Sequence, residues 1–150
     1  MSLRIGKKAP DFTLPSTLGE NFSLSDAVKS KACILYFYPK DFTTVCTKEA
    51  CGFRDNFDVF DKLSIDVIGI STDSISTHLK FKENYNLPFE LLSDIDGKVS
   101  KLYKARIPIL NMSKRITYLL NKDHLISAIY ENMFDAKKHI SKMVEELQKT

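Results

Sequence analysis

Two cysteines, Cys46 and Cys51, stand five residues apart just after an apolar run, and they are the residues in this chain best suited to do chemistry. Thiol chemistry proceeds through the thiolate, which is the nucleophilic form of cysteine. A thiolate in the first turn of a helix is stabilised by unpaired backbone N–H groups and by the positive end of the helix dipole. Cys46 lies in the turn between the apolar run 33–38 and a segment with helical periodicity. Since the sites of open α/β sheets collect at such strand-to-helix turns, we expect Cys46 to be a reactive thiolate.

A β-α-β unit is the element that positions this turn. The runs 33–38 and 66–71 are continuously apolar and rich in β-forming residues, which is typical of strands buried on both faces. Between them, a segment that begins near Cys46 predicts one crossover helix with an apolar face toward the sheet. That face consists of Phe53, Phe57, Phe60 and Leu63.

The other elements follow from the same kind of pattern. We expect a hairpin from 10–15 and 20–24, a helix over 74–85, a short helix after the turn at 96–97, strands over 117–120 and 125–130, and a terminal helix over 136–147. This order predicts an α/β fold with a mixed central sheet flanked by helices and an N-terminal β-hairpin. A length of 150 residues predicts one domain covering 1–150.

Composition excludes several classes of function. The 22 basic and 19 acidic residues are interspersed and leave a net charge of +3, which offers no basic face for nucleic acid. The apolar runs are shorter than the roughly 20 residues that a membrane span needs, and the basic N-terminus lacks the apolar segment of a secretion signal. We therefore expect a cytoplasmic protein without a membrane partner. No metal or cofactor is expected, because the histidines fall in separate elements without the spacing of a ligand pair: His78, His124 and His139.

The pattern Pro39-x-x-x-Thr43-x-x-Cys46 resembles the active-site signature of the peroxiredoxins residue for residue. Further blocks look like the bacterioferritin comigratory protein, or peroxiredoxin Q, branch of that family, so the resemblance covers nearly the whole chain. They are 9–12, 37–41, 46–51, 53–55, 67–71 and 87–94. Such a resemblance implies a thioredoxin-like fold and a peroxidase that serves antioxidant defence and redox homeostasis.

The resemblance also implies a role for each site residue. Cys46 would be the peroxidatic nucleophile, and Thr43 would contact the peroxide. Arg115 would stabilise the thiolate and the transition state, since fixed donors aimed at developing negative charge lower a barrier. Glu49 would orient Arg115, and Pro39 would shield the thiolate from solvent. In many members of the branch proline and glycine occupy positions 44 and 45, which here are Thr44 and Val45, and the segment 104–113 lacks the glycines commonly seen before the arginine.

Cys51 would resolve the oxidised Cys46 as an intramolecular disulfide. Five residues along a regular helix separate two Cα atoms by about 8.6 Å, whereas a disulfide tolerates at most about 7 Å. Oxidation would therefore unwind the segment from about 44 to 52, and Gly52 should ease this because glycine lowers helix stability by about 1 kcal/mol relative to alanine. The implied partners are hydrogen peroxide and organic hydroperoxides, with thioredoxin or a similar dithiol protein as reductant. The implied assembly is a monomer or weak homodimer.

Plainer interpretations exist for each of these residues. Cys46 could be a small buried residue at a helix start, Cys51 could pack toward the phenylalanines, and Thr43 could cap the helix. Arg54 and Arg115 could be surface cations in weak ion pairs. Cys33, inside an apolar strand, is expected to be an inert buried thiol.

Two other functions compete with a peroxidase. A thioredoxin-like disulfide oxidoreductase would share the fold, but it uses Cys-x-x-Cys, whereas four residues separate Cys46 from Cys51. A non-enzymatic interaction or chaperone module would keep the fold without any special reactivity at Cys46, which thiol titration alone would reveal.

Overall fold

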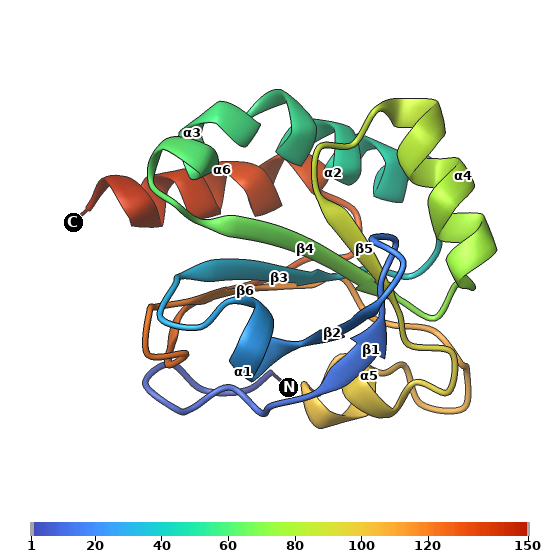
Figure 1. The fold of residues 1–150 in the computed structure, drawn as a ribbon, viewed down its shortest axis with the longest axis horizontal. Helices are drawn as coiled ribbons and strands as arrows, with labels where there is room; N and C mark the ends of the chain where they lie inside the picture. The colour runs from blue at the N-terminus through green and yellow to red at the C-terminus, as the bar shows by residue number, and fades with distance from the viewer. Residues whose placement is uncertain (1, 150) are drawn as a thin grey trace.

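A five-stranded sheet of mixed direction forms the centre of the fold. The structure, a computed structural model, describes residues 2–149, and its sheet has the strand order β5-β4-β3-β6-β7 (Figure 1). β5, β4 and β3 run parallel, while β6 is antiparallel to both β3 and β7. The expected mixed α/β architecture is therefore confirmed. The strands are β3 (Cys33–Phe37), β4 (Asp66–Ser71), β5 (Glu90–Ser93), β6 (Ile116–Leu120) and β7 (Ile126–Glu131).

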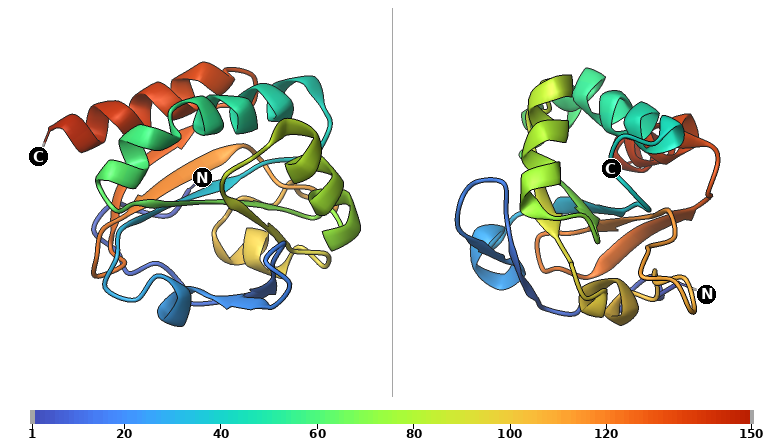
Figure 2. Two further views of the ribbon diagram at one scale, coloured as in Figure 1. Left: turned by 45° about the horizontal axis from the view of Figure 1, so that its top comes forward. Right: turned by 90° about the vertical axis from the view of Figure 1, so that its right-hand side faces the viewer.

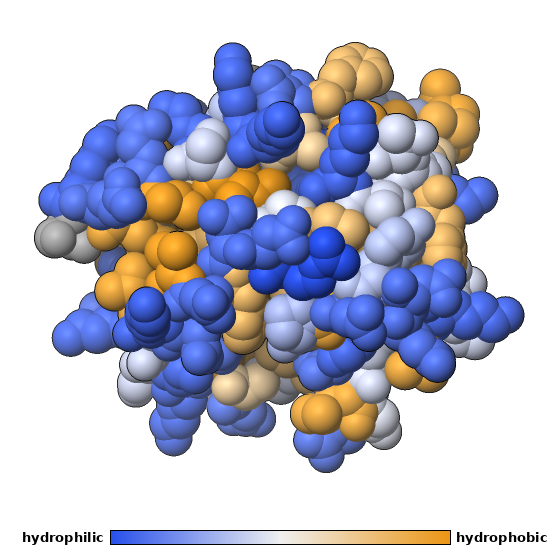
Figure 3. Space-filling view, turned by 90° about the horizontal axis from the view of Figure 1, so that it is seen from above, coloured by the Kyte–Doolittle hydropathy of each residue, from blue (hydrophilic) through white to orange (hydrophobic). Residues whose placement is uncertain are grey.

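Helices cover both faces of this sheet (Figures 1 and 2). On one side lie α2 (Thr44–Asp55), α3 (Phe57–Lys62), α4 (Ile75–Tyr85) and α6 (Ala136–Gln148). On the other lie α1 (Leu24–Ala27), α5 (Lys98–Leu102) and the expected hairpin of β1 (Thr13–Pro15) and β2 (Asn21–Ser23). Figure 3 looks onto the first side, where polar side chains dominate and apolar ones gather in limited areas. Within residues 2–149, no helix is both long enough and apolar enough to span a bilayer.

β3 supplies both hydrophobic cores because its alternate side chains point to opposite faces. Tyr36 packs among the residues beneath α2, α4 and α6, whereas Leu35 and Phe37 pack among those on the hairpin side. All five residues of β3 are buried, as the continuous apolar run predicts. The loop that carries Cys46 therefore starts from a strand buried on both faces, at the centre of the sheet.

The crossover helix differs from the prediction. It is broken at Asn56 into α2 and α3, since the Asn56 backbone N–H and side-chain Nδ2 both donate to the Gly52 carbonyl, at 3.2 and 2.8 Å. These bonds end α2 and let the chain turn. The break explains a second error: Leu63 was expected on the apolar face, but it follows α3 and is 54% exposed.

Two elements were not expected. β5 pairs with β4 at the edge of the sheet, and the hairpin lies beside it, with Ser16 bridging Leu92. β5 begins two residues after Pro88, and its four residues are too few to show an alternation of apolar and polar side chains. Leu91 and Leu92 are nevertheless fully buried. α1 is a single turn after β2, and one turn leaves no periodic signal.

Candidate active site

Cys46 lies in the first turn of α2, at the end of the loop that leaves β3. The first closed backbone bond of this turn runs from the Thr47 N–H to the Thr43 carbonyl at 2.9 Å, so the preceding amides lack partners within the helix. The Cys46 side chain is 1% exposed, and its Sγ accepts a hydrogen bond from Arg115 Nη2 at 3.2 Å. Helix start and guanidinium therefore act on the same sulfur, and both favour a negative charge there.

Arg115 is held at three points, just before β6. Its Nη2 contacts Cys46, its Nη1 donates to Glu49 Oε1 at 2.7 Å, and its Nε donates to the Met133 carbonyl at 2.9 Å. The side chain is 3% exposed, so the surface ion-pair interpretation is wrong for this residue. Burial opposes the charge, but Glu49 and Cys46 outweigh it and raise the pKa of Arg115 above its ordinary value. The result is a fixed buried cation.

Glu49 sits one helical turn after Cys46 and is fully buried. Burial raises the pKa of its carboxyl to about 7, against the opposing effect of Arg115. Its Oε1 pairs with Arg115, whereas its Oε2 has no hydrogen-bond partner among the described residues. The arrangement fits the expectation that Glu49 orients the arginine, and it leaves one buried oxygen to be explained.

Thr43 precedes α2 in an extended conformation, but its side chain does not cap the helix. Its Oγ1 donates to the Lys40 carbonyl at 2.7 Å, so the capping interpretation is wrong. With its proton so engaged, the oxygen keeps lone pairs that can accept from a ligand. Pro39 is buried between β3 and this loop, and its shielding of the thiolate remains a prediction.

The other cysteines differ in environment. Cys51 is partly exposed and lies on α2 with Cys46, and both thiols are free. Cys33 is fully buried, and burial, aided by Asp66, raises its pKa to about 12, which agrees with an inert thiol. Arg54 donates to Asp55 and to the Tyr85 carbonyl at the end of α4, in a different direction from Arg115.

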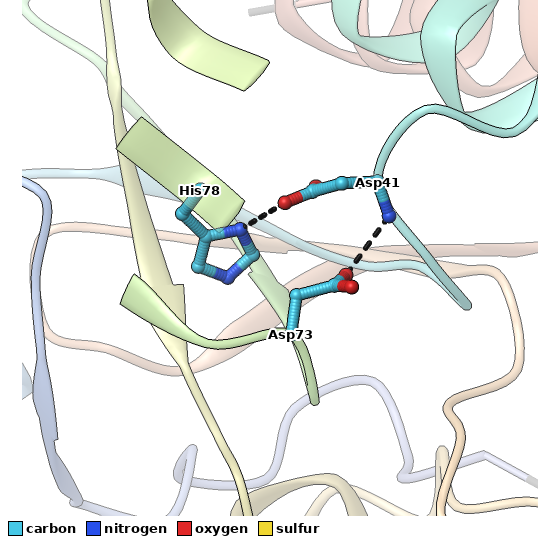
Figure 4. Close-up of side chains that lie close together, drawn as sticks. All are labelled: Asp41, Asp73 and His78. Atoms are coloured by element: carbon cyan, nitrogen blue, oxygen red, sulfur yellow. Dashed lines mark hydrogen bonds and ion pairs between the residues drawn. The ribbon is translucent and has the colours of Figure 1, made fainter. Parts of the chain in front are cut away.

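A hydrogen-bonded cluster that the sequence did not predict holds the loop before Cys46 (Figure 4). Asp41 accepts from Tyr38 Oη at 2.6 Å, and its other oxygen lies 2.5 Å from His78 Nδ1. His78 Nε2 donates to the Leu92 carbonyl at 2.9 Å, and Asp73 accepts from the Asp41 backbone N–H at 2.8 Å. Asp41, Asp73 and His78 lie close enough to share a metal ion. Both carboxylate oxygens of Asp41 and both ring nitrogens of His78 are hydrogen-bonded within the protein. The cluster therefore anchors the loop and leaves no polar side-chain atom of these two residues unpaired.

The same loop carries local backbone strain. Phe42 has a φ of 66°, a left-handed conformation that is unusual for a bulky side chain. Its ring packs edge-on against Phe81 of α4, with centroids 5.1 Å apart. Strained residues persist only where their surroundings fix them, and here Asp41 and Phe42 provide that fixation immediately before Thr43.

His139 was also missed. It is fully buried in α6, and its Nδ1 lies 2.8 Å from Thr117 Oγ1 and 3.5 Å from Glu49 Oε2. No local pattern could find it, because its partners on β6 and α2 are distant in sequence. Its position on the buried face of α6 indicates burial, but it does not indicate these partners.

Comparison with known proteins identifies the family. The AhpC/TSA family matches residues 5–129. The chain is 44% identical to a Coxiella burnetii protein named as a peroxiredoxin bcp, over 98% of this chain and all of that protein. It is 42% identical to the chloroplastic peroxiredoxin Q of Oryza sativa subsp. japonica, over 95% of this chain and 66% of that protein.

A solved structure is similar to nearly the whole chain. Peroxidoxin BcpB of Mycobacterium tuberculosis superposes with a TM-score of 0.91 at 31% identity, covering 98% of this chain and 97% of that one. The thioredoxin-like fold implied by the sequence resemblance is thereby confirmed. The chain belongs to the AhpC/TSA family and, within it, to the bacterioferritin comigratory protein or peroxiredoxin Q branch of the thiol-dependent peroxidases.

Proposed function

We propose that the chain reduces hydrogen peroxide and organic hydroperoxides with Cys46 as the peroxidatic nucleophile. The observation that carries this proposal is the contact of Arg115 with Cys46 Sγ, made while Glu49 and the Met133 carbonyl hold the guanidinium in place. A cation so fixed stabilises the thiolate before the reaction and the leaving oxygen during it, without reorganising. Fold and family are shared with other thiol proteins, whereas this contact is specific to the chemistry proposed.

The peroxide step conserves atoms and charge. The Cys46 thiolate attacks the outer oxygen of the hydroperoxide, and the O–O bond breaks as the S–O bond forms. Sulfur is oxidised to a sulfenic acid, and the inner oxygen leaves as alkoxide or hydroxide and takes a proton from solvent. Arg115 and the free amides at the start of α2 face the atoms on which negative charge develops.

Thr43 and Pro39 are proposed to position the substrate and exclude water. Because the Thr43 hydroxyl donates to the Lys40 carbonyl, its oxygen is free to accept the O–H of a bound peroxide. Pro39 is buried in the same loop, which supports a role in limiting the access of water to Cys46. Both roles concern binding geometry, so each should affect the peroxide step more than the resolving step.

Cys51 is proposed to resolve the sulfenic acid. Its thiolate attacks the Cys46 sulfur, a disulfide forms, and the sulfenic hydroxyl leaves as water. Both cysteines start on α2, where regular geometry sets their Cα atoms about 8.6 Å apart, so the first turns must unwind and the contact between Arg115 and Cys46 must break. A thioredoxin-like dithiol protein would then reduce the exposed disulfide through a mixed disulfide. One chain contains both cysteines of the resolving step, and the external dithiol protein is needed only to reduce the disulfide.

Rapid mixing of the reduced protein with hydrogen peroxide tests the proposal. The chain has no tryptophan, so the reaction is quenched chemically and the remaining thiols are counted. We expect two of the three thiols to disappear per peroxide consumed, and no fast reaction in Cys46→Ser, because a hydroxyl is almost fully protonated where a thiolate would be present. Turnover retained in Cys46→Ser would refute the assignment.

A further inference from the structure

One buried carboxylate oxygen in the site has no hydrogen bond. Glu49 Oε2 is fully enclosed, and His139 Nδ1 lies 3.5 Å from it. Nothing in the peroxide step uses His139. Buried polar atoms are almost always paired, so an unpaired carboxylate oxygen facing a ring nitrogen calls for a physical explanation.

The hydrogen bonds of His139 fix which ring nitrogen carries a proton. Nε2 lies 2.8 Å from the Asn132 carbonyl, which can only accept, so Nε2 is the donor. Nδ1 of a neutral ring is then an acceptor, and it receives the Thr117 hydroxyl at 2.8 Å. Because the Thr117 hydroxyl takes up the Nδ1 lone pair, Nδ1 offers no donor to an ionised Glu49 Oε2, and the approach of the two atoms would be repulsive. One additional proton on either partner removes that repulsion, as a carboxylic acid facing imidazole or a carboxylate facing imidazolium.

The geometry points to one additional proton held by the pair of Glu49 and His139, on one partner or the other, which makes His139 a positioning residue that acts on Cys46 through Glu49 and Arg115. The inference rests on the proposed function of Cys46. Its argument is charge balance: a Cys46 thiolate and a Glu49 carboxylate against the single cation of Arg115 leave a buried net charge of −1. One additional proton on the Glu49–His139 pair makes the group neutral, which a buried site strongly favours.

The surrounding groups do not supply this proton in another way. Tyr36 of β3 lies near Glu49, but its hydroxyl, like Glu49 Oε2, has no hydrogen-bond partner among the described residues, so the two groups are not bonded to each other. Burial raises the pKa of Tyr36 well above the ordinary value, so it keeps its own proton. Tyr130 of β7 packs its ring edge-on against His139. Asp135, before α6, is the other acidic group acting on His139, and its carboxylate already accepts the Lys138 N–H.

Burial assigns the proton mainly to Glu49. It raises the pKa of Glu49 to about 7 and lowers the pKa of His139 to about 4. Between about pH 4 and pH 7 the close approach of Glu49 and His139 is therefore a contact between a carboxylic acid and a neutral ring, more than an ion pair. As the pH rises through the pKa of Glu49, the proton leaves, and the carboxylate competes with the Cys46 thiolate for Arg115.

Nuclear magnetic resonance of the reduced full chain tests this without relying on turnover. The side-chain carboxyl carbon of Glu49 reports its ionisation, and the ring nitrogens of His139 report the tautomer. We expect Nε2–H on His139, and a Glu49 titration that lies on the order of one pH unit lower in Cys46→Ser than in the wild type, since serine removes the nearby negative charge. Identical titrations, or a proton on Nδ1 at pH values where Glu49 is also protonated, would overturn the inference.

Two variants separate positioning from packing. His139→Asn keeps a polar atom near the place of Nδ1, whereas His139→Gln keeps one near Nε2 and is closer to histidine in volume. We expect the glutamine variant to lower the Glu49 titration and to slow the peroxide step on the order of tenfold, less than the hundredfold or more typical of removing an oxyanion donor. The asparagine variant should stay nearer to the wild type. A purely structural role predicts the reverse order.

The outcomes distinguish failure of the inference from failure of the proposed function. A wild-type protein that does not reduce peroxide refutes the function, whatever the titrations show. A wild-type protein that reduces peroxide, with Glu49 titrating identically in wild type and Cys46→Ser, refutes only the additional proton. Should neither His139 variant fold, the comparison of wild type with Cys46→Ser still decides.

Discussion

Gly52 gives the sharpest test of how α2 is built. From the sequence alone, Gly52 is expected to ease the unwinding of α2. The structure adds a second reason for glycine at this position, which is packing. A Cβ placed on Gly52 would lie 2.9 Å from Ile140 Cδ1 and 3.1 Å from Ile140 Cγ1, because α2 and α6 approach closely there. A shallow groove between these helices is lined by both residues. Glycine is thus both the weak point of α2 and the residue that lets α6 approach.

Gly52→Ala therefore has two opposing effects. Helix propensity favours alanine by about 1 kcal/mol, while the contact with Ile140 costs about 1–3 kcal/mol, nearer the lower end because the clashing atom ends a side chain. In an Ile140→Val background Cδ1 is absent, so the propensity gain should prevail. We expect Gly52→Ala to leave the free energy of unfolding unchanged or to lower it by up to about 1 kcal/mol in the wild type, and to raise it by about 1 kcal/mol in the valine background.

Urea unfolding of the reduced protein measures all four members of this cycle. The alanine effect should change by about 1–2 kcal/mol between the two backgrounds. If α2 must unwind for the disulfide to form, the stabilised double variant should also form it about fivefold more slowly than Ile140→Val, with an unchanged peroxide step. An equal effect of alanine in both backgrounds would show that Ile140 does not restrict position 52. Normal disulfide formation in a stabilised helix would refute the unwinding.

Three further predictions follow from the site. Cys51→Ser should consume one equivalent of peroxide and stop at the sulfenic acid of Cys46, which mass spectrometry detects; sustained turnover with a thioredoxin-type donor would exclude Cys51 as the required resolver. Arg115→Ala should slow peroxide reduction by about a hundredfold and reduce thiolate absorbance at neutral pH, while the matched Arg54→Ala should change neither; equal effects of both would indicate a general loss of charge. Amide exchange over 45–52 should be faster in the disulfide form while β3 and β4 stay protected, and equal protection in both redox states would contradict redox-coupled unwinding.

The sequence predicted those parts of the fold and site that leave a local or contiguous signal. β3 and β4 are continuous apolar runs, and Pro39, Thr43 and Cys46 follow one of them at fixed spacing. Arg115 lies far from that motif in sequence, and it came only from a resemblance over the wider chain. Its contact with Cys46 spans 69 residues. Periodicity relates residues within one helix or strand, so it cannot predict a contact between residues this far apart in sequence.

The unpredicted features depend on particular side-chain contacts, most of them tertiary. The break between α2 and α3 depends on one asparagine, Asn56, whose side chain bonds the Gly52 carbonyl, and a helical apolar pattern continues across it. The anchor of Asp41 by His78 joins residues 37 apart, so histidines screened for metal-ligand spacing gave no sign of it. β5 is an edge strand of four residues whose burial comes from neighbours on both faces. For Asp41 and for β5 the partners are fixed by the fold and not by the adjacent sequence.

The loop before Thr43 is fixed by its contacts, whereas α2 after Thr43 is the part that we expect to open during disulfide formation. Before Thr43, the loop is held by the hydrogen bonds of Asp41 to Tyr38 and His78 and by the packing of Phe42 on α4. After it, α2 has no side-chain cap and carries a glycine in its third turn. Unwinding the first turns would move Cys46 away from Arg115 while the loop stays in place. Because the loop need not be rebuilt, reduction of the disulfide should restore the peroxide site by helix formation alone.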